Sequence, residues 1–152
     1  MSLSLVLKIV ERLSLCAGLT LFGFSGGAAM AAEDYGVTRP VTVQITNATS
    51  KAALRCQLIL AHFVTYEADA LAKGQETTLE LLRGDQDGTL IFSGKDGRQM
   101  ALENLLCGFD DDWGGTRNDL NLAQLRDGSS NRLQIVCSGA DRLTCQAAQA
   151  NK

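Results

Sequence analysis

The clearest pattern in the chain is a strict alternation of apolar and polar residues at positions 41–46. Val41, Val43 and Ile45 alternate there with threonine and glutamine. A period of two is typical of a β-strand that buries one face and exposes the other. Residues 132–137 alternate in the same way, so we predict a strand in both places.

A longer run, residues 56–66, is largely apolar at both odd and even positions. Such a run predicts a single central strand that is covered on both faces. Shorter strands are predicted at 77–82, 89–93 and 98–107, separated by turns rich in glycine and aspartate. The last of these also contains residues that favour helix, but a strand fits the neighbouring pattern better.

The C-terminal third of the chain carries weaker signals. They indicate a Gly- and Asp-rich loop at 108–117, a short strand at 120–122, a helical turn at 123–126 and weak helical character at 140–152. Short strands separated by turns predict an all-β fold, which we expect to be an antiparallel β-sandwich of about seven strands. Its architecture would be immunoglobulin-like or jelly-roll-like, stapled by disulfides, with a short C-terminal helical tail.

The first 31 residues have the composition of a cleavable secretory signal. Lys8 and Arg12 lie before an apolar stretch, and residues 29–31 read Ala-Met-Ala, the small-residue pattern of a cleavage site. The apolar stretch has about 12 residues, whereas a membrane-spanning helix needs about 20, so a retained anchor is the weaker alternative. We expect residues 32–40 to be an extended leader and 41–152 to be one domain.

Charge narrows the classes of partner. The 14 basic and 17 acidic residues of the chain fall to 12 and 16 when Lys8, Arg12 and Glu11 are removed with the signal. This mild acidity argues against a nucleic-acid partner, which requires a basic patch, and against attraction to an anionic membrane surface.

The cysteines left after cleavage predict two disulfides. Cys16 is lost with the signal, and the four that remain are an even number in an exported chain. We expect the pairs Cys56–Cys107 and Cys137–Cys145. No Cys-x-x-Cys pair occurs and histidine is present once, so neither a zinc site nor a cofactor is predicted.

Three residues are weak candidates for catalysis. His62 is the single histidine, although a structural role is the more ordinary interpretation of a lone histidine in an apolar run. Glu67 and Asp69 would share one face of a strand at about 6.6 Å from each other. Paired carboxylates at about this separation hydrolyse glycosides, so a small secreted hydrolase is an alternative function.

Asp85 and Asp87, followed by Gly88, resemble a fragment of a calcium-binding loop. Carboxylates at alternate positions can converge on a cation where a glycine lets the backbone turn. A third ligand and a distal glutamate are not in register, so a simple hairpin turn is the competing interpretation. A calcium-stabilised structural or adhesion protein is therefore the third function considered.

The most unusual segment is an acidic loop around the single tryptophan. Its candidate binding residues are Asp110, Asp111, Asp112, Trp113, Arg117 and Asp119. Tryptophan is frequent at binding hot spots, and adjacent carboxylates favour a basic partner. The competing interpretation is a solvated turn whose tryptophan folds back onto the core. The leading prediction is a non-catalytic binding or accessory protein, periplasmic or secreted, that contacts another protein through this loop and keeps no membrane anchor after cleavage.

Overall fold

The computed structural model describes residues 34–50 and 53–148, all of which belong to one unit of the chain, Ala31–Lys152. The predicted signal, residues 1–31, lies outside this described part. No helix among the described residues is long and apolar enough to cross a membrane.

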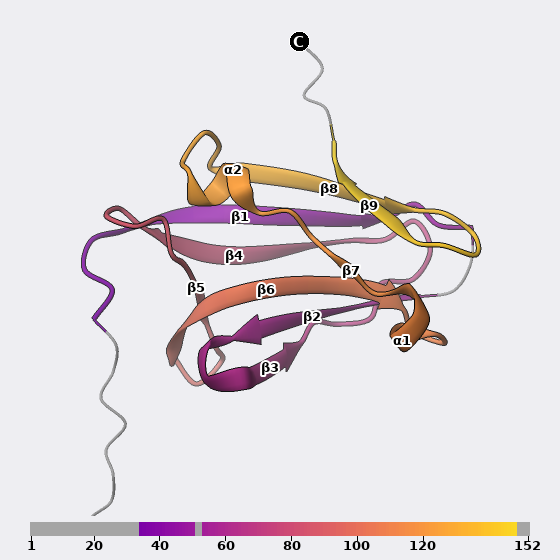
Figure 1. The fold of residues 1–152 in the computed structure, drawn as a ribbon, viewed down its shortest axis with the longest axis horizontal. Helices are drawn as coiled ribbons and strands as arrows, with labels where there is room; N and C mark the ends of the chain where they lie inside the picture. Colours follow the sequence, from indigo (N-terminus) through magenta and orange to yellow (C-terminus); the bar gives the residue numbers. More distant parts are fainter. Residues whose placement is uncertain (1–33, 51–52, 149–152) are drawn as a thin grey trace, which may run out of the picture. The chain divides into compact units, whose positions relative to one another are not determined.

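One open, mixed sheet of nine strands makes up most of the described chain (Figure 1). The elements are β1 (Thr38–Asn47), β2 (Leu54–Leu60), a turn (Ala61–Phe63), β3 (Val64–Glu67), β4 (Glu76–Gly84), β5 (Leu90–Ser93), β6 (Gln99–Phe109), α1 (Trp113–Thr116), β7 (Asn118–Asp119), α2 (Ala123–Arg126), β8 (Arg132–Ser138) and β9 (Thr144–Ala147). The strands follow the order β3-β2-β6-β5-β4-β1-β8-β9, and β7 pairs with β6 beside this path.

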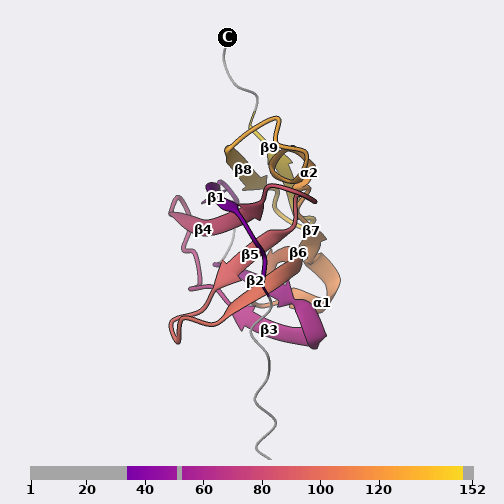
Figure 2. The same cartoon turned by 90° about the vertical axis from the view of Figure 1, so that its left-hand side faces the viewer.

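The two halves of the sheet bury their inner faces in one hydrophobic core. Strands β1, β4 and β8 supply one half of this core and β2 and β6 supply the other, while β5 passes between the two halves (Figure 1, Figure 2).

The prediction of a mostly-β fold is confirmed, but the structure shows one open sheet and not the predicted sandwich. An all-antiparallel arrangement is wrong, because β1 and β8 are parallel. Alternation reveals which face of a strand is buried and leaves the choice of neighbour open.

Strand β1 shows why the strongest pattern was reliable. Val41, Val43 and Ile45 are buried, as predicted, although the strand begins at Thr38, inside the expected leader. Pro40 fits into β1 because its side of the strand faces β8, whose pairing with β1 starts only at Thr42. The N–H that proline lacks would therefore have had no ladder partner there.

The single strand predicted over residues 56–66 is wrong, because the chain reverses in its middle. Val64 donates its backbone N–H to the carbonyl of Ala61, and His62 and Phe63 between them have φ of 60° and 59°. Hairpin turns with two such residues usually contain asparagine or glycine, so the sequence offered no turn signal here. The outer face of β2, with Arg55 among its residues, is half-buried and not covered as predicted.

Both predicted disulfides are confirmed, and each joins directly opposite residues of neighbouring strands. Cys56 of β2 faces Cys107 of β6 with 4.1 Å between Cα atoms, and Cys137 of β8 faces Cys145 of β9 at 4.0 Å. The predicted helical tail is wrong over its described part, where β9 is a strand. Pairing with β8 and the disulfide outweigh the weak local preference for helix.

Candidate functional site

The acidic loop around the tryptophan, residues 110–117, leaves strand β6 and leads into a short strand that pairs with β6 again. We call this loop the excursion. Strand β6 continues to Phe109, beyond the cysteine at which the sequence placed its end. The single turn of α1 follows, and β7 then pairs back onto β6 (Figure 1). Asn118 of β7 lies opposite Cys107, so this excursion is anchored next to the Cys56–Cys107 disulfide.

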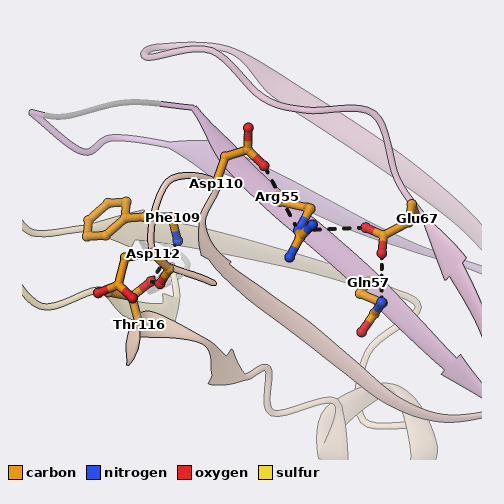
Figure 3. Close-up of polar contacts among 7 residues, drawn as sticks. All are labelled: Arg55, Gln57, Glu67, Phe109, Asp110, Asp112 and Thr116. Carbon is orange, nitrogen blue, oxygen red and sulfur yellow. Dashed lines mark hydrogen bonds and ion pairs between the residues drawn. The ribbon is translucent and has the colours of Figure 1, made fainter. Parts of the chain in front are cut away.

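Hydrogen bonds within the excursion fix its conformation. The Asp112 carboxylate caps α1 by accepting the backbone N–H of Gly115 at 3.1 Å. The Thr116 hydroxyl donates to the Asp112 carbonyl at 2.5 Å and accepts the Phe109 N–H at 2.9 Å (Figure 3). Aspartate is a favoured N-cap because its carboxylate satisfies an otherwise unpaired N–H. One of the three adjacent aspartates is therefore committed to local structure.

Trp113 lies against the outer face of the sheet and is half-buried. Arg55 and Gly108 are directly opposite each other on β2 and β6. The Arg55 guanidinium carbon is 4.6 Å from the centroid of the Trp113 ring, and a Cβ atom built on Gly108 would lie only 2.8 Å from a ring carbon. The indole thus occupies the space that glycine leaves empty, and it is neither folded into the core nor free in solvent.

Carboxylates flank the arginine that the tryptophan covers. The Nε atom of Arg55 is 3.9 Å from Glu67 and 4.0 Å from Asp110, and Glu67 also accepts a 2.7 Å hydrogen bond from the Gln57 amide (Figure 3). The Arg55 Nε atom is buried and makes no hydrogen bond, and both carboxylates are about half exposed and near the 4 Å limit of an ion pair, so the ion pairs contribute little to stability. The stack with Trp113 is the more defined contact of Arg55.

We call the group Arg55, Glu67, Asp110 and Trp113 the tryptophan surface. It unites two predicted binding residues with a predicted catalytic candidate. Of the other predicted binding residues, Asp111 and Arg117 are exposed, Asp112 caps α1, and Asp119 accepts a hydrogen bond from the Asn104 amide.

Sequence reasoning missed the two residues that support the tryptophan, Arg55 and Gly108. No local signal marks either of them, because they meet only through the register of β2 and β6. This register follows from the Cys56–Cys107 pairing, which fixes the neighbouring residues opposite each other. A correct disulfide prediction together with antiparallel pairing would have found the contact.

The three catalytic candidates lie in different segments of the chain. His62 is exposed in the turn between β2 and β3, at the opposite end of β2 from Arg55. Glu67 is the last residue of β3, so Asp69 lies outside the strand on which the two were expected to share a face. The hydrolase therefore stays a prediction.

The two aspartates proposed for calcium have partners within the protein. Asp85 forms a 2.8 Å ion pair with Arg39. The Thr89 hydroxyl and the Thr89 backbone N–H both donate to the Asp87 carboxylate. These hydrogen bonds, that of the hydroxyl above all, hold the pKa of Asp87 below its usual value. No cluster of three or more metal-ligating side chains occurs in the described part of the chain. The hairpin-turn interpretation accounts for these contacts.

Comparison with known proteins assigns no function to this chain. The chain matches no protein-family model, and no curated protein shows significant similarity to it. The two disulfides nevertheless indicate an oxidising, extracytoplasmic setting.

Proposed function

We propose that this protein is an exported, non-catalytic binding or accessory protein of the periplasm or cell surface. Its partner would be another protein, which docks on the tryptophan surface. The observation that carries the proposal is the half-buried Trp113, held on the outer face of the sheet by Arg55 and Gly108.

The composition of the surface supports this proposal. Tryptophan and arginine are the residues most enriched among binding hot spots, and here they stack on each other. Asp110, Asp111 and Glu67 are exposed around them. Such a rim favours a basic partner and would accelerate encounter at low salt.

The fixed conformation of the excursion supports it as well. Asp112, Thr116 and Phe109 hold its backbone by hydrogen bonds, and a disulfide lies beside its base. A surface that is already ordered loses less conformational entropy when it binds. This is a property of recognition sites built on a rigid scaffold.

The test compares the half-buried Trp113 with the exposed Phe63. Trp113→Ala should weaken capture of a partner from the exported fraction by at least about 2 kcal/mol, while Phe63→Ala, at the far end of β2, should leave capture unchanged. Both variants are first compared by thermal unfolding. A large fall in melting temperature for Trp113→Ala alone would make the tryptophan structural, and wild-type capture by a folded Trp113→Ala protein would refute the proposal.

A further inference from the structure

Strand β4 has a free edge along more than half of its length. On one side β4 pairs with β1 from Glu76 to Gly84. On the other side β5 pairs with Leu82 and Arg83 only. Over the described residues, therefore, no strand pairs with the outer edge of β4 between Glu76 and Leu81.

Backbone groups of Thr78 and Glu80 point toward this edge. The N–H of Gly84 is directed to the β5 side, where it donates to a carbonyl at 2.9 Å, and the N–H of Asp85 is directed to the opposite side at 3.0 Å. Because these directions alternate along an antiparallel strand, even-numbered residues of β4 present their N–H and C=O groups outward.

A groove of about 380 Å³, lined by both polar and apolar residues, runs beside the edge. Tyr66 and Phe92, whose ring centroids are 4.7 Å apart, line it together with Leu79. Its charged lining residues are Asp69, Glu80 and Lys95, which carry a net negative charge. The groove thus combines unpaired backbone groups with two aromatic side chains and a net negative charge.

We propose that this groove binds an extended, basic peptide segment of a partner protein, which adds to β4 as a further strand. Strand addition satisfies the exposed N–H and C=O groups and lets pockets select alternate side chains. An apolar side chain of the peptide would rest on Tyr66 and Phe92, and a lysine or arginine would lie opposite Asp69 and Glu80. This site is separate from the tryptophan surface and does not depend on the function proposed for it.

Charge also disfavours a second copy of this chain as the occupant. If two β4 edges paired antiparallel about Thr78, Glu76 of each copy would lie opposite Glu80 of the other. Like charges directly opposite each other destabilise a strand pair. The same glutamates would stabilise a strand that carries basic residues at those positions.

The first experiment uses the disulfide-bonded protein and a short synthetic peptide of alternating threonine and valine with a lysine at each end. Amide hydrogen exchange measured by NMR should slow at Thr78 and Glu80 by at least about tenfold when the peptide binds. The amides of Thr77 and Leu79, which face β1, are the internal control and should not change. A matched peptide with glutamate in place of lysine should bind at least about fivefold more weakly.

Two variants test the edge and the charge separately. Thr78→Pro removes an outward N–H and leaves the bonds to β1 in place, so the fold should persist while peptide binding is lost. Glu80→Lys should reverse the preference between the lysine and glutamate peptides, which keeps the proposal testable if the proline variant fails to fold.

Three results would overturn the proposal. One is the absence of saturable binding of the lysine peptide to the wild-type protein. Another is protection of the β3 or β9 edge in place of Thr78 and Glu80. The third is protection of Thr78 and Glu80 that rises with protein concentration without peptide, which would make the occupant a second copy.

Discussion

The two ends of β2 present aromatic side chains in different ways. At its start, Trp113 rests on Arg55 and Gly108 and is half-buried. At its end, Phe63 is 91% exposed in a turn with positive φ. Exposure alone would favour Phe63 as the contact residue. Support by neighbours favours Trp113, because an ordered side chain loses less entropy on binding.

The largest expected loss of stability concerns the Cys56–Cys107 disulfide, which lies beside the loop that carries the tryptophan. Replacing Cys56 and Cys107 together by alanine should lower the free energy of unfolding by about 4 kcal/mol, because their separation of 51 residues leaves a long loop unconstrained in the unfolded chain. Replacing Cys137 and Cys145, separated by 8 residues, should cost about 2.5 kcal/mol. Urea unfolding measures both, and equal losses would contradict this ranking.

The next largest effect tests whether Trp113 packs on Gly108. Gly108→Ala places a Cβ atom 2.8 Å from the Trp113 ring and 3.1 Å from the Arg117 backbone, so it should destabilise the protein by about 1–3 kcal/mol and shift the tryptophan fluorescence. The control is Gly114→Ala, where nothing lies within 4 Å of the added atom. If the two variants behaved alike, the indole would not be packed on Gly108.

Substitutions in the turn at the other end of β2 should raise the stability of the protein. Replacing His62 by Asn and Phe63 by Gly supplies residues that tolerate positive φ, and should raise the free energy of unfolding by about 1 kcal/mol. Chemical denaturation of the double variant measures the gain. A loss of stability would show that Phe63 contributes contacts that outweigh the strain of its backbone.

The smallest expected loss of stability is that of the Arg55→Gln variant. Arg55→Gln removes the stack on Trp113 and two long ion pairs to half-exposed carboxylates, and should cost about 0.5–1 kcal/mol. The tryptophan emission should nevertheless change, because the ring loses the cation above it. An unchanged spectrum would mean that Gly108 alone holds the ring, and would weaken the contrast with Phe63.

Much of the local structure followed from the sequence. Alternation located β1 and β8 with their buried faces, and Asp and Gly residues located the turn after β4. The even number of cysteines predicted two bridges, and the closeness of Cys137 and Cys145 in the sequence favoured the correct pairs, Cys56–Cys107 and Cys137–Cys145. These features are local or compositional, so they need no knowledge of which strands become neighbours.

Other features were decided only by the tertiary structure. The reversal at His62 and Phe63, the parallel pairing of β1 with β8 and the seating of Trp113 over Arg55 and Gly108 have no signal in their own segments. Each depends on contacts between distant segments, and these contacts outweigh local preferences such as the helical tendency of the C-terminal tail. The period of a pattern fixes which side chains face inward, whereas the neighbour that a strand takes depends on the packing of the whole core.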